Sequence, residues 1–212
     1  MIVSVGAFKG GVGKSTIAIN IALEFAKNSK VCIIDLDHIN NTSYNFFTKH
    51  KHNNITTYNP QNIDIIAELV TSEKYDNFVF DLGGFESNLT IGASVVSDVI
   101  CIPFRKGAIE EDSLTSYIEK LIVTADILEK DKRVILIPTM FHHSYSKQRV
   151  LKEYSSLCEL GLDIAEPISF SCKYSKALDD GKSVYEAGYM KQALEIKKLI
   201  ELIKWGKKCT EE

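Results

Sequence analysis

The sequence contains few cysteines and no long apolar segment. Its five cysteines lie among 212 residues, and none forms a Cys-x-x-Cys pair. This spacing argues against a disulfide scaffold and against a cysteine-rich zinc or iron–sulfur site. No stretch approaches the roughly 18 to 20 apolar residues of a membrane-spanning helix, and no charged-then-apolar leader opens the chain. We therefore expect a cytoplasmic protein.

Basic residues are not in excess either. The chain carries 25 Lys and Arg against 28 Asp and Glu, a formal net charge of -3, and so lacks the overall basic character of many nucleic-acid binders. The charge is unevenly distributed, because residues 1–141 carry 13 basic and 17 acidic side chains whereas residues 142–212 carry 12 and 11. The C-terminal third is locally basic, so the whole-chain charge does not exclude a DNA-binding patch.

Short apolar runs of strand length alternate with helical patterns along the chain. This order predicts an α/β fold with a mostly parallel twisted sheet and helices on both faces. No internal repeat or Ser/Gly-rich linker interrupts it, so we expect residues 1–212 to form a single domain. The expected strands are 2–5, 31–34, 77–80, 99–102, 134–137 and, more weakly, 164–170, and the expected helices are 15–27, 60–72, 111–129, 146–159 and 188–205. The polar segment 38–58 is expected to be a long loop, and Pro103 and Pro138 are expected to mark strand ends.

A glycine-rich loop lies between the first expected strand and the first expected helix, with the sequence Lys9-Gly-Gly-Val-Gly-Lys-Ser-Thr16. Glycines let backbone N–H groups point inward at a phosphate chain, and the following helix adds the partial positive charge of its N-terminus. Lys14 can bridge the terminal phosphates, and the Ser15 hydroxyl can bind Mg²⁺. The order of strand, loop and helix predicts a P-loop NTPase fold. The candidate nucleotide-binding residues are Lys9, Gly10, Gly11, Val12, Gly13, Lys14, Ser15 and Thr16.

Two later strands end in aspartates, in the sequences Asp35-Leu-Asp37 and Asp81-Leu-Gly-Gly84. The carboxyl ends of parallel strands form the ligand-binding edge of an α/β sheet, so these carboxylates are expected near the glycine-rich loop. Gly83 and Gly84 provide a backbone that can reorient when a phosphate group leaves.

These motifs resemble those of the ParA/MinD family of P-loop ATPases, and most closely those of short ParA-type partition ATPases. The early lysine in KGGVGKS is similar to the family's deviant Walker A box, and Asp35-Leu-Asp37 is similar to its DxD switch I. The family usually continues with Pro-Gln-Gly, whereas this chain reads His38-Ile-Asn-Asn41. The run from Asp81 to Gly84 resembles a Walker B aspartate merged with a DxxG switch II, which implies that Asp81 holds Mg²⁺. The candidate Mg²⁺ ligands are therefore Ser15, Asp35 and Asp81.

The resemblance implies a homodimer that encloses ATP between its subunits, with ATP or ADP and Mg²⁺ as cofactors. In that arrangement Lys9 crosses the dimer interface to the other subunit's nucleotide, and Asp37 positions the water that attacks the γ-phosphate. Lys9, Lys14 and Asp37 are then the catalytic residues of an ATPase that produces ADP and phosphate. Adenine recognition is expected where the late strand ends, at residues 138–141, with Met140 as the candidate.

The same resemblance implies that the ATP-bound dimer binds DNA without sequence preference and segregates plasmid or chromosomal DNA. A ParB-like centromere-binding adaptor would stimulate slow, Mg²⁺-dependent hydrolysis, which releases the dimer. The protein would be cytoplasmic and associated with the nucleoid in its ATP state. The candidate DNA-binding residues are Lys147, Arg149, Lys152, Lys173 and Lys176.

A MinD-like ATPase that cycles on a membrane and positions a division site or other cargo is the alternative. Apolar residues in 196–205 recur with helical spacing beside lysines, which suits a helix on a membrane surface. The same pattern fits a last helix packed on the sheet with a basic outer face. We favour that second interpretation because no linker separates the segment from the preceding helix, so membrane contact is not expected. A metal-cluster carrier is disfavoured by the absence of a Cys-x-x-Cys pair.

Overall fold

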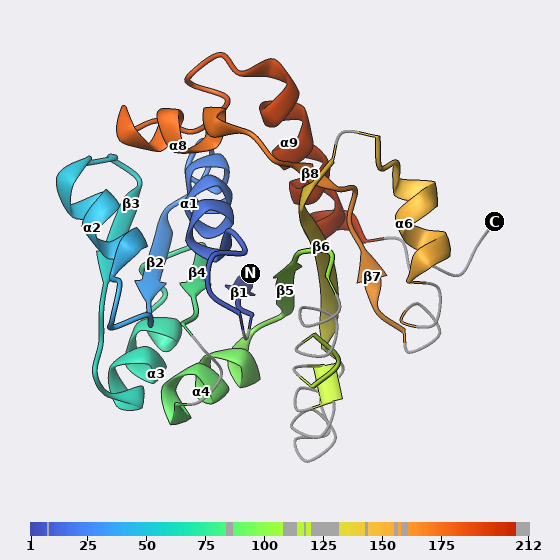
Figure 1. Cartoon of the computed structure of the whole chain (residues 1–212). Helices are drawn as coiled ribbons and strands as arrows, with labels where there is room; N and C mark the ends of the chain where they lie inside the picture. The colour runs from blue at the N-terminus through green and yellow to red at the C-terminus, as the bar shows by residue number, and fades with distance from the viewer. Residues whose placement is uncertain are drawn as a thin grey trace.

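A parallel sheet forms the centre of the molecule (Figure 1). The computed structural model describes residues 1–7, 9–83, 87–107, 114–116, 118–119, 132–142, 144–154, 157 and 161–206. The strands run in the order β3-β2-β4-β1-β5-β6-β7, and β8 pairs with β6. They are β1 (Ile2–Val5), β2 (Val31–Asp35), β3 (Ile55–Tyr58), β4 (Asn77–Asp81), β5 (Val99–Phe104), β6 (Arg133–Phe141), β7 (Asp163–Ile164) and β8 (Ile168–Ser169). Because neighbouring strands are parallel, their carboxyl ends meet at one edge.

Helices cover both faces of the sheet. They are α1 (Lys14–Phe25), α2 (Thr42–Lys49), α3 (Ile63–Thr71), α4 (Asn88–Val96), α6 (Lys147–Glu153), α8 (Cys172–Asp179) and α9 (Met190–Trp205). Val31 and Ile33 of β2 belong to the core shared with α1 and α9, whereas Cys32 and Ile34 belong to the core shared with α3 and α4. This alternation buries β2 on both sides, which explains its continuous apolar sequence. The predicted α/β class with a mostly parallel sheet and helices on both faces is confirmed.

The prediction of a long loop over 38–58 is wrong, because this segment contains α2 and β3. Its polar composition hides the helix, which buries Phe46 and Phe47 and exposes most of its other residues. β3 pairs only with β2 along the sheet and is partly exposed, so it lacks the apolar run of an inner strand. Helices α4 and α8 were likewise not predicted.

The prediction that Pro103 and Pro138 mark strand ends is also wrong, because β5 and β6 continue through them. The carbonyl oxygen of Cys101 accepts a hydrogen bond from the Gly6 N–H, on the β1 side of β5. Backbone groups two residues apart in a strand face the same side, so the nitrogen of Pro103 faces this side too, beyond the end of β1. In the same way, the carbonyl oxygen of Leu136 accepts a hydrogen bond from the Ala165 N–H, just after the end of β7. The nitrogen of Pro138, two residues later, faces the same side, where β7 has ended. Each proline therefore lies where a neighbouring strand has ended and needs no N–H donor.

The expected helices at 15–27, 60–72, 146–159 and 188–205 correspond to α1, α3, α6 and α9, each shorter than expected. Most of the expected helix 111–129 lies outside the described residues. Within the described part of the chain, no helix combines the length and apolarity needed to cross a bilayer.

Candidate functional site

The glycine-rich loop connects β1 to α1 with a backbone that only glycine adopts easily. Gly11 and Gly13 have φ angles of 71° and 94°. A Cβ atom at either position would meet nothing within 4 Å, so backbone conformation and not space requires glycine there. Gly13 is the N-cap of α1, and Lys14 is its first residue. The loop therefore presents the N-terminus of α1 to the carboxyl edge of the sheet.

This loop forms one wall of a cleft of about 430 Å³, a volume typical of small-molecule sites. Across the cleft lies the connection between β2 and α2, so the structure brings the predicted loop and Asp37 together. Lys9 is exposed, and its main-chain carbonyl accepts a hydrogen bond from Lys14 Nζ at 3.2 Å. The lining residues are Gly10, Gly11, Gly13, Lys14, Ser15, Thr16, Asp37, Ile39, Asn40 and Thr42.

Asp81, at the end of β4, is a fully buried acid beside this loop. Burial, followed by the nearby charge of Asp35, raises its pKa from 3.8 to about 7, although Ser15, Ser43 and Lys14 lower it. Among the described residues, neither carboxylate oxygen has a hydrogen-bond partner of normal geometry. A buried carboxylate without partners is costly, and carboxylate and hydroxyl oxygens are ligands that Mg²⁺ prefers. Asp81 and Ser15 therefore fit a bound Mg²⁺.

Asp35 lies beside Asp81 in the β2–β4 register and is also buried. Its two carboxylate oxygens accept hydrogen bonds from the backbone N–H groups of Asp37 and Tyr44, both at 2.9 Å. Burial raises the pKa of Asp35, whereas these backbone bonds lower it. Asp35 thus anchors the segment that carries Asp37, a contact that the sequence did not indicate. A direct bond from Asp35 to Mg²⁺ stays a prediction.

Asp37 is half-buried, and its carboxylate accepts hydrogen bonds from the backbone and side-chain nitrogens of Asn40 at 3.1 and 2.9 Å. Gly83 lies close behind it, since a Cβ atom on Gly83 would be 3.3 Å from Asp37 Cα. The two predicted switch segments therefore touch at these residues. Gly84 lies outside the described residues.

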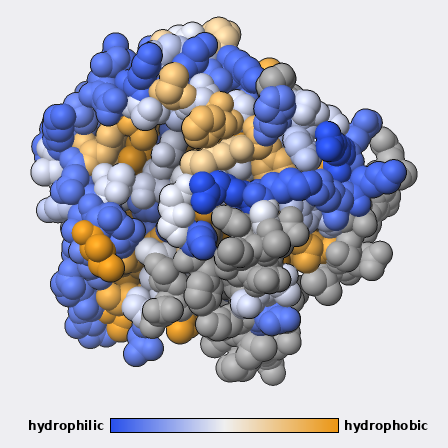
Figure 2. Space-filling view, viewed as in Figure 1, coloured by the Kyte–Doolittle hydropathy of each residue, from blue (hydrophilic) through white to orange (hydrophobic). Residues whose placement is uncertain are grey.

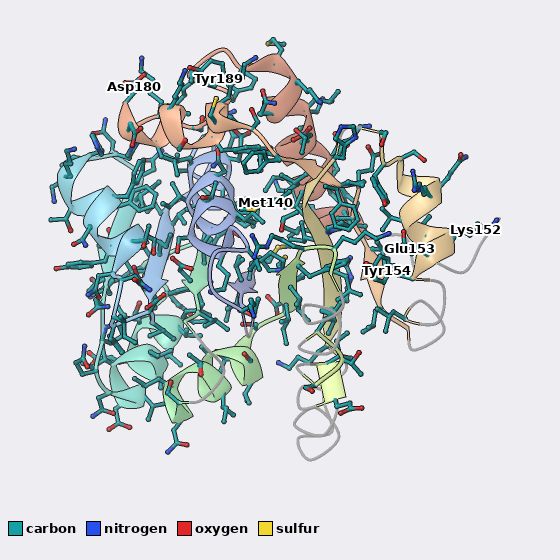
Figure 3. The ribbon with its side chains drawn as sticks, in the orientation of Figure 1. Met140, Lys152, Glu153, Tyr154, Asp180 and Tyr189 are labelled. Atoms are coloured by element: carbon teal, nitrogen blue, oxygen red, sulfur yellow. The ribbon has the colours of Figure 1, made fainter. Side chains whose placement is uncertain are left out.

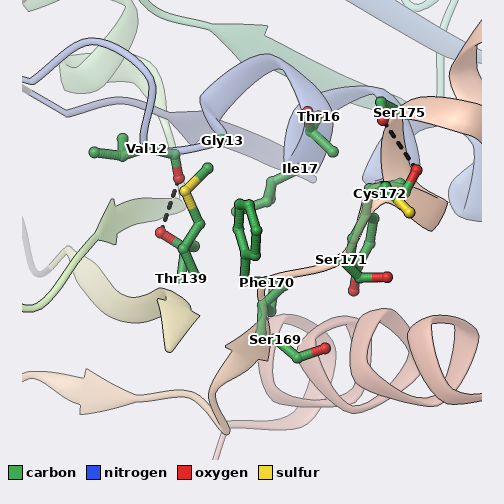
Figure 4. Close-up of a pocket in the computed structure, with 13 residues that line it drawn as sticks. Val12, Gly13, Thr16, Ile17, Thr139, Ser169, Phe170, Ser171, Cys172 and Ser175 are labelled. Carbon is green, nitrogen blue, oxygen red and sulfur yellow. Dashed lines mark hydrogen bonds between the residues drawn. The ribbon is translucent and has the colours of Figure 1, made fainter. Parts of the chain in front are cut away.

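A second, mostly apolar pocket of about 320 Å³ adjoins the glycine-rich loop (Figure 4). Met140, the predicted base-contacting residue, lines this pocket and is labelled at the centre of Figure 3. Its backbone has a left-handed φ of 57°, which is unusual for a residue other than glycine. Thr139 beside it donates to the Val12 carbonyl at 2.8 Å, which ties β6 to the loop. The exposed ring of Phe170 points toward Ile17 across the pocket, and the space-filling view shows apolar surface gathered there (Figure 2). Phe170 was not predicted as a site residue, because it lies about 155 residues after the loop in the sequence.

The five predicted DNA-binding residues do not form one patch within a chain. Lys147, Arg149 and Lys152 belong to α6, and Lys173 and Lys176 belong to α8. These helices lie at opposite ends of the molecule in Figure 1. The Arg149 guanidinium stacks over the Tyr145 ring at 4.0 Å.

The last helix, α9, buries an apolar stripe in the core that it shares with α1 and the sheet. Its core residues are Ala193, Ile196, Leu199, Ile200 and Ile203. The interpretation of 196–205 as a helix packed on the sheet is therefore confirmed. Trp205, at its end, is 80% exposed.

Comparisons with known proteins agree with this geometry. McdA from Cyanothece in its apo form superimposes with a TM-score of 0.77 at 18% identity, covering 95% of this chain and 98% of that chain. A Borrelia burgdorferi B31 protein described as a plasmid partition protein, bound to AMPPNP, gives 0.70 at 21% identity, with 96% and 98% covered. MinD in the MinC:MinD cell division complex of Aquifex aeolicus gives 0.71 at 15% identity, with 100% and 98% covered.

No curated protein sequence matches the chain significantly. The family model of the CobQ/CobB/MinD/ParA nucleotide binding domain matches residues 3–184, which is most of the chain. The predicted ParA/MinD membership is thereby confirmed. The chain belongs to the CobQ/CobB/MinD/ParA family of nucleotide-binding domains.

Proposed function

We propose that this protein is a ParA-type ATPase that hydrolyses ATP to ADP and phosphate. The observation that carries the proposal is that the glycine-rich loop and Asp37 line one cleft, with Asp81 buried beside the loop at the end of β4. The glycine-rich loop, the exposed side of Asp37 and the unpartnered Asp81 lie together at the carboxyl edge of the sheet. An apolar pocket of suitable size for a base adjoins the same loop.

In this proposal each residue has a separate task. The Met140 pocket holds the adenine, and the backbone N–H groups of the loop and Lys14 hold the phosphates. Ser15 and Asp81 would hold Mg²⁺, which neutralises phosphate charge when bound. Asp37 accepts a hydrogen bond from the attacking water and orients it toward the γ-phosphate. Because the reaction needs no covalent nucleophile in the protein, catalysis rests on positioning and charge.

Asp37→Ala tests this mechanism. The variant should bind ATP as the unchanged protein does and lose most of its turnover, measured as phosphate release. Lys14→Ala should instead lose ATP binding. Turnover at the unchanged rate in Asp37→Ala would remove Asp37 from the mechanism.

We further propose that ATP assembles a homodimer in which Lys9 reaches the nucleotide of the other subunit. Lys9 is exposed beside the phosphate cleft, and Ile39, which is 91% exposed, lies at the same cleft. A lysine so exposed beside the cleft can contact the phosphates of a nucleotide bound to a second molecule. Lys9→Ala should keep nucleotide binding and lose the ATP-dependent dimer in light scattering. A dimer that persists in this variant contradicts the enclosed-ATP arrangement.

The proposed cargo is plasmid or chromosomal DNA, bound without sequence preference and released after a ParB-like adaptor stimulates hydrolysis. The support is the locally basic C-terminal third, whose exposed Arg149, Lys152, Lys173 and Lys176 would be doubled in a dimer. DNA pull-down with ATP at stepped salt concentrations tests this proposal, and binding should weaken steeply with salt. DNA binding that is equal with ATP and ADP would contradict it.

A MinD-like membrane cycle is the second candidate, favoured by the exposed Trp205 beside Lys204 at the end of α9. Co-sedimentation with anionic liposomes in the presence of ATP distinguishes the two candidates. Sedimentation that depends on ATP and on Trp205 would favour the membrane role over the DNA role.

A further inference from the structure

The segment that carries Asp37 joins the end of β2 to the start of α2. Asp35 is the last residue of β2, and Asn41 is the N-cap of α2. Asn41 has a left-handed backbone at φ 50° and makes no side-chain capping bond to the helix. The position of the Asp37 carboxylate therefore depends on how the two ends of this connection are held.

Asn59, which directly follows β3, contacts both ends of the connection. Its Nδ2 donates to the main-chain oxygen of Asp35 at 2.9 Å and to Oδ1 of Asn41 at 2.9 Å. One amide thus uses both of its protons on two acceptors that flank Asp37. These contacts cross from the neighbouring edge strand, 24 and 18 residues away in sequence.

Two further side chains orient the Asn59 amide. Gln61 Nε2 donates to Asn59 Oδ1 at 3.3 Å and lies 3.0 Å from His38 Nδ1. The same His38 nitrogen lies 3.4 Å from Asn59 Oδ1, and Asn41 Nδ2 donates to the His38 carbonyl at 3.1 Å. With the Gln61 amide donating to its oxygen, the Asn59 NH₂ group is directed toward Asp35 and Asn41.

We propose that Asn59 is a positioning residue for ATP hydrolysis, which holds the Asp37 connection at both ends so that the carboxylate keeps its place in the phosphate cleft. The inference rests on the proposed function, because it requires Asp37 to orient the attacking water. Asn59 does not line the phosphate cleft itself. It therefore acts through Asp37, and its loss should affect turnover and not nucleotide affinity.

Asn59→Asp is the sharpest variant, because it keeps the size of the side chain and removes both donated protons. Asn59→Ala removes them without adding a charge. Asn54→Asp is the matched control, since Asn54 flanks the other end of β3 and donates its amide to the Ala26 carbonyl at 2.9 Å. We expect both Asn59 variants to lower kcat roughly tenfold, the usual effect of losing one or two hydrogen bonds. The KM for ATP and the affinity for a non-hydrolysable ATP analogue should change less than about twofold, and Asn54→Asp should resemble the unchanged protein.

A double-variant cycle separates positioning from general damage. In an Asp37→Ala background, Asn59→Asp should cause no further loss of turnover, because both changes remove the same function. A further tenfold loss in that background would overturn the inference, as would unchanged kcat in both single Asn59 variants.

Hydrogen exchange of the nucleotide-free protein gives a readout that does not depend on activity. Amides of 37–44 should exchange faster in Asn59→Asp, while those of α1 and β4 should not change. If the unchanged protein fails to hydrolyse ATP, the proposed function fails even where exchange shows the contact. If it hydrolyses ATP and Asp37→Ala keeps full turnover, Asp37 leaves the mechanism and the positioning inference fails with it. If both of those results agree with the proposal and the Asn59 variants keep full kcat, only the positioning inference fails.

Discussion

Replacing Asp81 by asparagine should stabilise the nucleotide-free protein above neutral pH. Asp81 is fully buried, and its carboxylate oxygens have no hydrogen-bond partner in the described part of the chain. Ser43 Oγ, which is also buried, faces this carboxyl group without a hydrogen bond of normal geometry in the described part of the chain. An asparagine amide fits the same space, carries no charge and can donate a proton to Ser43. The variant therefore removes the free-energy cost of burying the Asp81 charge, which the native protein keeps because that charge binds a ligand in the proposed mechanism.

The size of the effect follows from the pKa of Asp81, which the fold raises from 3.8 to about 7. Below about pH 4 the group is protonated in both the folded and the unfolded chain and contributes nothing to the pH dependence. Between pH 4 and 7 the folded protein keeps a proton that the unfolded chain has released, so the free energy of unfolding falls as the pH rises. Above pH 7 the loss is complete, and a shift of roughly three pKa units corresponds to about 4 kcal/mol.

Urea unfolding at about pH 5 and pH 8.5 measures this difference for both proteins without Mg²⁺ or nucleotide. The gain in the free energy of unfolding from Asp81→Asn should be larger at pH 8.5 than at pH 5 by about 2 kcal/mol or more. At pH 5 only about a third of the cost of burying the Asp81 charge is present. Glu68→Gln, an exposed change in the middle of α3, is the control and should show no such difference. An Asp81→Asn protein that is less stable at pH 8.5, or whose advantage is equal at both pH values, would refute the reasoning.

Three other changes test other parts of the site. Gly83→Ala places a Cβ atom 3.3 Å from Asp37 Cα, so kcat should fall several-fold while the affinity for an ATP analogue is retained, measured by steady-state kinetics and titration. Phe170→Ala removes a ring that is 77% exposed, so Tm should hardly change, whereas ATP-analogue affinity should weaken roughly tenfold in fluorescence titration. Arg149→Ala with Lys152→Ala should reduce the slope of log affinity for DNA against log salt by about 1 per lost phosphate contact, and an unchanged slope would exclude α6 from DNA binding.

The phosphate side of the site was predictable because its chemistry is local in the chain. The loop from Lys9 to Thr16 contains the glycines, lysines and hydroxyl groups of this part of the site in one short stretch. Its glycines alone predict a backbone with positive φ angles. Asp37 and Asp81 could be added because parallel strands bring their carboxyl ends to one edge. The burial of Asp81 without partners could not be predicted, because it depends on packing by α1 and the β2–α2 connection.

The segment 38–58 shows why the remaining residues were missed. Its asparagines and histidines suggested an unstructured loop, yet two of them, His38 and Asn41, belong to the network in which Asn59 holds Asp35 and Asn41. Buried polar groups are stable when they satisfy one another, so a polar composition can mark an ordered network as well as a loop. Composition alone cannot distinguish an ordered polar network from a loop, since the residues that hydrogen-bond one another lie on both sides of β3 in the sequence.

The proposed nucleotide site is built from two parts of the chain that lie far apart in the sequence. The phosphate-binding loop is one short stretch, and a substitution there should affect any nucleoside triphosphate equally. The apolar pocket has one wall from the loop and α1 and the other from β6, β8 and the segment after β8. The Thr139–Val12 hydrogen bond holds β6 against the loop. Phe170 and Met140 contact the space beside the loop and not the loop's phosphate cleft. We therefore expect discrimination among bases to depend mainly on residues of the late segment, and the capacity to bind a triphosphate to depend on the early one.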